Sequence, residues 1–133
     1  MFIFSVLFHL VSYDMWFYIS HVILHKYFAK IHYIHHKTPY DKLKWHNTHD
    51  GHIAENIAQG LGLFIPLLFY IDIPALVVAG IIISIRGWMR HDERCSFIVG
   101  NHHLLHHRYP DCNFSEYYVD YLFGTLRENT IER

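Results

Sequence analysis

Long apolar segments alternate with histidine-rich segments along this chain, and this alternation constrains the fold more than any other feature. The apolar segments cover residues 2–28 and 53–85, and the histidine-rich segments cover residues 30–52 and 91–125. A helix needs roughly 20 apolar residues to cross a bilayer. The first apolar segment is long enough for one such helix, and the second could form a hairpin of two shorter arms. We therefore expect an all-α, integral membrane helical bundle with a histidine-rich cap.

The 133 residues are expected to form a single domain, 1–133. Its predicted parts are a membrane helix at 1–30, a histidine-rich segment at 31–52, a membrane hairpin at 53–90, a second histidine-rich segment at 91–125 and a tail at 126–133. The hairpin arms are predicted near 54–70 and 74–90, with Pro66 kinking the first arm. A shallow, partly re-entrant hairpin is the alternative, because each arm is near the lower limit for spanning.

Basic residues flank the predicted hairpin but are missing from its Ile-Asp-Ile-Pro turn. Those before it are Lys26, Lys30, Lys37, Lys42 and Lys44, and those around its far end are Arg86, Arg90, Arg94 and Arg108. Cytosolic flanks of membrane segments are enriched in Lys and Arg, so both histidine-rich segments are expected on the cytosolic side. The basic residues form no continuous run and the net charge is −1, so no nucleic-acid partner is expected.

Fourteen of the residues are histidine, and eight of them form three motifs. His21 and His25 form an HxxxH motif; His32, His35 and His36 form an HxxHH motif; and His103, His106 and His107 form a second HxxHH motif. Positions three and four apart share one face of a helix, so we expect each motif to direct two or three imidazoles at one point. Eight ligands are more than one ion needs, whereas two ions about 3.5–4 Å apart would use this number.

The ligand type narrows the choice of metal. There is no Cys pair and no Glu-x-x-His motif, which argues against a zinc finger and against a carboxylate di-iron bundle. All-imidazole sites suit iron, zinc, copper or nickel. A membrane site with open coordination positions favours iron and dioxygen, while zinc stays open for the isolated protein.

Further side chains are weaker candidates. His91 is expected as a ninth metal ligand at the end of the hairpin. His102, His52, Asp14 and Asp92 are expected either as ligands or as hydrogen-bond partners that orient a ligand ring. His9 stands alone on an apolar helix and is expected to be hydrogen-bonded or interfacial.

The motifs together resemble the fatty acid hydroxylase and sterol desaturase superfamily of membrane-bound, histidine-rich di-iron oxidases. The segment Asp14-Met-Trp-Phe-Tyr-Ile-Ser-His21-Val-Ile-Leu-His25 has the context of that family's first motif, and only six residues separate His25 from His32. Other matching positions are His52-Ile-Ala-Glu55, which resembles a His-Pro-x-Glu, His91-Asp92, and the closing residues Asn113, Asp120 and Phe123-Gly124-Thr125. The resemblance covers about residues 12–125.

The resemblance implies O2-dependent hydroxylation or desaturation of a sterol or fatty acyl C–H bond, in lipid biosynthesis, at two Fe ions. It also implies O2 as co-substrate and an external electron donor, namely a b-type cytochrome with its NADH-dependent reductase, in the endoplasmic reticulum. The chain shows no flavin or nicotinamide fingerprint of its own. Which lipid is oxidised, and whether the product is an alcohol or an alkene, stays open.

This chain departs from the family pattern in three ways. Ile53 replaces the proline of His-Pro-x-Glu, Gly87 replaces the first histidine of an HxxxH that ends at His91, and the first motif lies close to residue 1. We therefore expect a minimal or N-terminally short member, with completion of its bundle as a homo-oligomer as the alternative. The rival hypotheses are a non-catalytic or degenerate histidine-rich metal-binding membrane protein, and a haem protein.

Overall fold

The computed structural model describes residues 1–128, and these residues form helices joined by short loops, with no strand. The helices are α1 (Phe2–Tyr27), α2 (Ala29–His32), η1 (His35–Lys37), η2 (Tyr40–Lys42), η3 (Trp45–His49), α3 (Ile53–Gly60), η4 (Leu61–Leu68), α4 (Ile73–Arg90), η5 (Glu93–Cys95), α5 (Ser96–Val99), α6 (His102–Arg108) and α7 (Tyr117–Phe123), where η marks 3₁₀ geometry. The predicted all-α class is confirmed. Residues 129–133 of the predicted tail lie outside the described residues.

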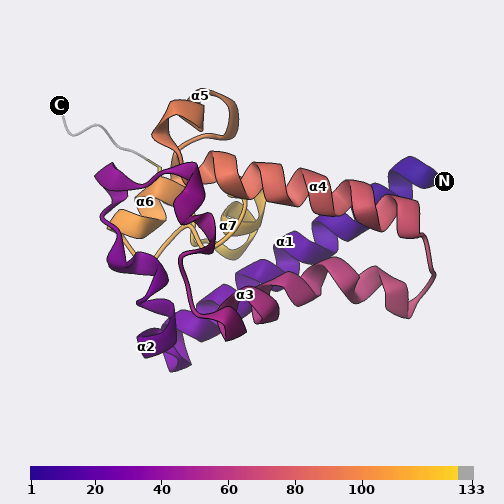
Figure 1. The fold of residues 1–133 in the computed structure, drawn as a ribbon, viewed down its shortest axis with the longest axis horizontal. Helices are drawn as coiled ribbons and strands as arrows, with labels where there is room; N and C mark the ends of the chain where they lie inside the picture. The colour runs from indigo at the N-terminus through magenta and orange to yellow at the C-terminus, as the bar shows by residue number, and fades with distance from the viewer. Residues whose placement is uncertain (129–133) are drawn as a thin grey trace.

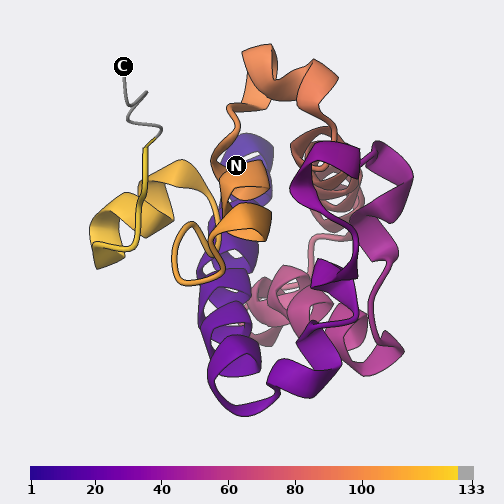
Figure 2. The same ribbon diagram turned by 90° about the vertical axis from the view of Figure 1, so that its left-hand side faces the viewer.

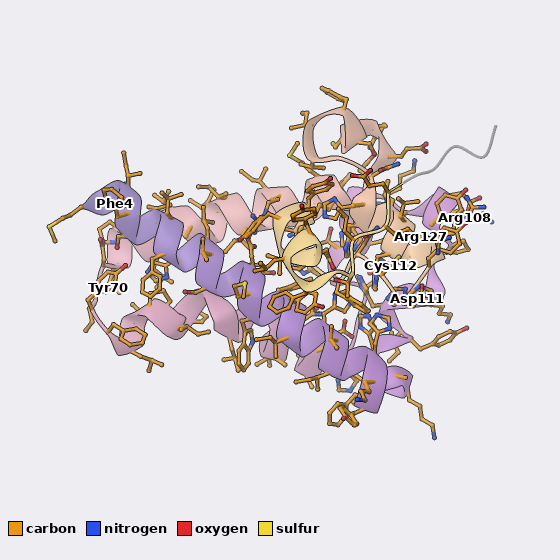
Figure 3. The ribbon with its side chains drawn as sticks, turned by 180° about the vertical axis from the view of Figure 1, so that it is seen from behind. Phe4, Tyr70, Arg108, Asp111, Cys112 and Arg127 are labelled. Carbon is orange, nitrogen blue, oxygen red and sulfur yellow. The ribbon has the colours of Figure 1, made fainter. Side chains whose placement is uncertain are left out.

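The longest elements run along the long axis of the molecule. In Figure 1, α1, α4 and the arm formed by α3 and η4 extend toward the end that carries the N-terminus, while α2, α6 and α7 gather toward the opposite end. Figure 2 views the molecule from that opposite end, where the histidine-rich segments cover the ends of the long helices. Figure 3 shows the same polarity, with Phe4 and Tyr70 at one end and Arg108 and Arg127 at the other.

Two helices, α1 and α4, are long and apolar enough to cross a membrane, and α3 with η4 adds a shorter apolar segment. Only 28 % and 22 % of the residues in their most apolar windows are buried, so most of this apolar surface faces outward. The core between the helices is correspondingly small, with Val6, Ala75 and Ala79 at its centre. A surface of this kind suits lipid, where apolar side chains need no protein cover, and the molecule is a membrane helical bundle.

The first arm of the hairpin differs from the single kinked helix that we expected. α3 is α-helical, but the chain continues from Leu61 to Leu68 as a 3₁₀ helix with Pro66 inside it. This arm packs closely against α1: a Cβ added at Gly62 would lie 2.6 Å from Trp16 Cβ. The close approach explains why glycine is needed at position 62.

Proline inside a 3₁₀ helix leaves a carbonyl without its donor, and α1 supplies one. In 3₁₀ geometry the carbonyl of Leu63 would accept from the nitrogen of residue 66, which as proline has no N–H. His9 Nδ1 lies 2.7 Å from the Leu63 oxygen and donates in its place. His9 is therefore hydrogen-bonded, as expected, and its partner is the backbone of the hairpin.

α4 begins and ends with identifiable signals. Asp72 caps its N-terminus, because its carboxylate accepts from Ala75 N at 3.1 Å, and Pro74 lies in the first turn. Near its other end, Arg86 pairs with Asp14 of α1, and Arg90 lies 2.9 Å from the Glu116 carboxylate that precedes α7. These charges pair within the bundle and so bind the C-terminal segment to the membrane helices.

Candidate metal centre

Nine histidines from α1, α2, η1, α6 and the end of α4 converge at one end of the bundle. The first histidine group consists of His21, His25, His32, His36 and His106, and the second histidine group consists of His35, His91, His103 and His107. Within each group, one ring nitrogen of every member lies within 4.8 Å of the others. The two groups are adjacent, because the rings of His36 and His107 have centroids 4.6 Å apart.

The two HxxHH motifs are divided between the groups. In the motif at 32–36, His32 and His36 join the first group while His35 joins the second; at 103–107, His103 and His107 join the second while His106 joins the first. On α6, residues four apart differ in direction by about 40° and residues three apart by about 60° the other way, so His106 can reach the other group. The motif at 32–36 runs from the end of α2 into η1. Each HxxHH motif thus places two of its three rings in one group, within the two or three that we expected, and sends the third to the other group, while His21 and His25 lie together in the first group.

The spacing of the ring nitrogens suits a shared metal ion. In the first group the closest Nε2–Nε2 distances are 2.9 Å from His32 to His21 and 2.9 Å from His32 to His36, and His106 lies 3.1 Å from His36. In the second group His91 Nε2 lies 3.2 Å from His35 Nε2 and 3.2 Å from His103 Nε2. Ligands at roughly 2.0–2.1 Å from one ion are about 2.9 Å apart at right angles and about 3.3 Å apart at tetrahedral angles.

The outer nitrogens of several rings are already hydrogen-bonded, which determines their tautomers. His21 Nδ1 lies 2.5 Å from the Phe114 carbonyl, and His106 Nδ1 lies 2.6 Å from the Cys112 carbonyl. His32 Nδ1 lies 2.7 Å from a carboxylate oxygen of Glu55. Because these acceptors have no proton to give, each Nδ1 must be the donor. The Nε2 atom of each neutral ring then presents a lone pair to the centre of the group.

Two lone pairs therefore face each other between His21 and His32. Neither Nε2 has a proton of its own when both rings are neutral, yet the two atoms are only 2.9 Å apart. This contact is repulsive unless a cation lies against both nitrogens. The side chains present thus fit a metal ion in the first histidine group.

In the second group, buried nitrogens without partners give the same indication. Both ring nitrogens of His107 and the Nδ1 of His103 are buried and lack a hydrogen-bond partner in the part of the chain that is described. Leaving a buried polar atom unpaired costs about 1–3 kcal/mol. A metal ion in this group would bind the one lone pair that each neutral ring offers, including that of His107.

The surroundings keep these imidazoles neutral, as metal ligation requires. Burial lowers the pKa of His35 to about 4 and that of His91 to about 3. Burial, with the neighbouring rings, holds the pKa of His106 and His107 well below the usual value of 6.5. Charging any of these rings would place a cation in a low-dielectric site beside other imidazoles.

A hydrogen-bonded loop holds the carbonyls that orient the rings. Asp120 accepts from the backbone N–H groups of Phe114 and Ser115, each at 2.8 Å, and from Thr125 Oγ1 at 2.7 Å. Asn113 has a positive φ of 57° and accepts from the backbone N–H of Arg127. Through these contacts Asn113, Asp120 and Thr125 fix the loop that supports His21 and His106.

The weaker candidates lie outside both groups. His102 Nε2 bonds to the Ser115 carbonyl at 2.9 Å, and His52 caps α3 by accepting from Ala54 N. Asp14 accepts from Arg86 and from the Tyr118 hydroxyl. Asp92 pairs with Arg94. None of these four side chains forms a hydrogen bond or ion pair with a ring of either group in the described structure.

A largely apolar cavity of about 750 Å³ reaches both groups. It lies between α1, the α3–η4 arm and α4, and at one end His21, His35, His91 and His103 line it. Along its length the walls are formed mainly by apolar side chains and glycines, among them Phe17, Gly60, Leu63, Val77, Gly80, Ile81, Ile83 and Ile85. Between Val77 and His91, α4 alone extends roughly 20 Å.

Sequence reasoning missed several partners of the candidate ligands. Glu55 was matched only as part of a motif, because a Glu in the first turn of a helix is an ordinary capping residue and nothing local indicates that it is buried. The carbonyls of Cys112 and Phe114 have no signature in a sequence, because every residue carries a carbonyl. Arg86 as the partner of Asp14 was also missed, although an acid in a membrane helix demands a cation.

One of the comparisons with known proteins found a match. The model of the fatty acid hydroxylase family matches residues 6–125, which include all nine histidines of the two groups. No curated protein and no solved structure gave a match.

Proposed function

The chain belongs to the fatty acid hydroxylase family, and from this premise we propose that it oxidises a C–H bond of a membrane lipid at two metal ions, one in each histidine group. The main support for the proposal is that histidines of both groups line the same apolar cavity. His21, His35, His91 and His103 belong both to the candidate metal centre and to the wall of that cavity.

The nine proposed ligands are His21, His25, His32, His35, His36, His91, His103, His106 and His107. We propose iron as the working metal, since all-imidazole sites suit it and the family chemistry uses dioxygen. The chemistry that such ions supply when bound is the reduction of dioxygen and the removal of hydrogen from an unactivated C–H bond. Zinc would occupy the same ligands in protein isolated without iron.

The chain's own residues hold the rings, hold the lipid and exclude water. Phe114 packs against His21, His25 and His106 at centroid distances of 5.4–5.8 Å and covers the first group. Leu63, Val77 and Ile81 offer an apolar surface along which a long lipid could lie with one end at the histidines. A cavity of this size and polarity is typical of sites that bury most of a small apolar ligand.

Hydroxylation consumes O2, two electrons and two protons, and it gives an alcohol and water; desaturation with the same electrons gives an alkene and two waters. We propose that the substrate is a sterol or a fatty acyl lipid. We also propose that the electrons come from a b-type cytochrome and its NADH-dependent reductase. The histidine groups would face the cytosol, in the endoplasmic reticulum membrane.

The first test is metal content per chain, by elemental analysis of detergent-solubilised protein reconstituted with Fe(II). We expect about two ions in the wild type and fewer in His106→Ala. His102→Ala is the matched control, because His102 lies in the same helix but bonds to the Ser115 carbonyl, and it should keep both ions.

The second test is lipid oxidation by the same proteins, supplied with an electron donor and O2 and analysed by mass spectrometry for added oxygen or lost hydrogen. The wild type and His102→Ala should form product, and His106→Ala should not. Wild-type protein that binds metal but oxidises neither sterols nor acyl lipids would instead indicate a metal-binding protein without catalysis.

A further inference from the structure

Glu55 is a buried carboxylate whose charge no basic side chain balances. It is 2 % exposed, and its Oε1 accepts from His32 Nδ1 at 2.7 Å. Its Oε2 is buried and has no hydrogen-bond partner among the described residues. No lysine or arginine in residues 1–128 forms an ion pair with it, and its one ionic contact is with His32.

His32 connects this carboxylate to the centre of the first histidine group. The Nε2 atom of His32 lies 2.9 Å from that of His21 and 2.9 Å from that of His36. A buried carboxylate is costly unless a positive charge lies close to it. A metal ion on the far nitrogen of His32 would supply that charge through one imidazole ring.

The second histidine group has no equivalent. His91 Nδ1 bonds to the backbone carbonyl of Gly87 at 2.9 Å, while His103 Nδ1 and both nitrogens of His107 lack hydrogen-bond partners. In the described part of the chain, no carboxylate oxygen bonds to a ring of this group. The two groups therefore differ in ligand number, five against four, and in whether a carboxylate hydrogen-bonds to a ligand ring, although the Glu55 charge also acts on His35 without such a bond.

We propose that Glu55 is a positioning residue that makes the first histidine group hold its metal ion more tightly than the second. The inference rests on the proposed function, because it concerns the same two ions. A carboxylate behind a ligating histidine holds the ring in place and raises its basicity, and losing such a partner typically costs 10–100-fold in metal affinity. The first group then fills before the second.

The test is stepwise binding of Co²⁺ to the metal-free full-length chain in detergent, followed by absorption spectroscopy and by competition with a chelator. We expect two ions with unequal affinities. Glu55→Gln keeps a hydrogen-bond acceptor but loses the charge, and should weaken the tighter ion about 10–100-fold. Glu55→Ala should weaken it further. Glu93→Gln, which alters an exposed acid at the same end of the molecule, is the control and should change neither affinity.

Assignment to one group comes from single-group variants. His107→Ala should leave only the first group able to bind, and His21→Ala only the second. The site that remains in His107→Ala should bind Co²⁺ more tightly, and adding Glu55→Gln should weaken it. Adding Glu55→Gln to His21→Ala should have a clearly smaller effect, because Glu55 acts on His35 without a hydrogen bond to its ring. The comparison of the two histidine variants does not depend on whether Glu55 variants fold.

Equal affinities in the two single-group variants would overturn the proposal, and so would an equal effect of Glu55→Gln in both backgrounds. If the wild-type chain still binds two ions, neither of these results contradicts the proposed function. Wild-type chain that binds no metal would instead overturn the proposed function, and the role of Glu55 with it.

Discussion

His35 belongs to the same histidine group as His103, and not to the group of His32 and His36 in its own motif. His91 joins the two, since its Nε2 lies 3.2 Å from the Nε2 of each. Sequence neighbours in an HxxHH motif thus serve different sites, while residues from distant segments share one.

The divided motifs predict which pairs of substitutions act together. His35→Ala and His103→Ala should each cost one metal ion per chain, and the double variant should lose no more than either alone, because both remove the second group's ion. His35→Ala with His32→Ala should lose both ions. Elemental analysis of the four proteins measures this; equal losses in the two double variants would contradict the division.

A second prediction concerns the contact between His9 and the hairpin. His9→Leu should destabilise the protein by about 1–3 kcal/mol, because the buried Leu63 carbonyl loses its donor. Pro66→Ala restores an N–H at position 66 and should recover part of that stability in the double variant. Unfolding in detergent measures the three variants. Equal destabilisation with and without Pro66→Ala would show that the missing proline N–H is not the cause.

A third prediction concerns the cavity wall at Gly60. A Cβ added there meets no atom within 4 Å, and its backbone is helical, so Gly60→Leu should be tolerated and should narrow the cavity. Displacing about two methylene groups of a bound lipid costs about 1.6 kcal/mol, or roughly tenfold in Kd.

The probe is quenching of Trp88, which lines the cavity, by a brominated C18 fatty acid, in a background where the other two tryptophans are Phe. Ile57→Leu, on an exposed face of the same helix, is the control and should leave Kd unchanged. An unaltered Kd in Gly60→Leu would mean that the lipid binds elsewhere.

A fourth prediction is that acid destabilises the metal-free protein. His35 and His91 have folded-state pKa values of about 4 and about 3 because they are buried, whereas both titrate near 6.5 when unfolded. Between these values the unfolded chain binds more protons, so stability falls as pH falls below about 6.5.

The melting temperature of metal-free protein, measured from pH 7.5 to pH 5, should therefore decrease. His35→Gln removes one of the titrating rings and should show a shallower decrease than the wild type. His46→Gln, which changes a histidine outside both groups, should match the wild type. A melting temperature that rises toward pH 5 would contradict the buried, neutral state of these rings.

Local patterns were enough to predict the helical class, the membrane helices and the set of nine histidines. Apolar length and histidine spacing depend on residues close together in the chain, so they can be read without the fold. The closing segment with Asn113, Asp120 and Thr125 was recognised as a pattern. The sequence did not show that these residues position the Cys112 and Phe114 carbonyls.

Tertiary structure alone decided how the nine rings divide into five and four, because that depends on where α6 and the end of α4 lie against α1 and η1. It also decided the partners: Glu55 for His32, the Leu63 carbonyl for His9, and Arg86 for Asp14. Each pairing satisfies a buried polar group across a long stretch of sequence. The amino-acid sequence shows which buried polar side chains will need partners, and only packing in three dimensions determines which partners they find.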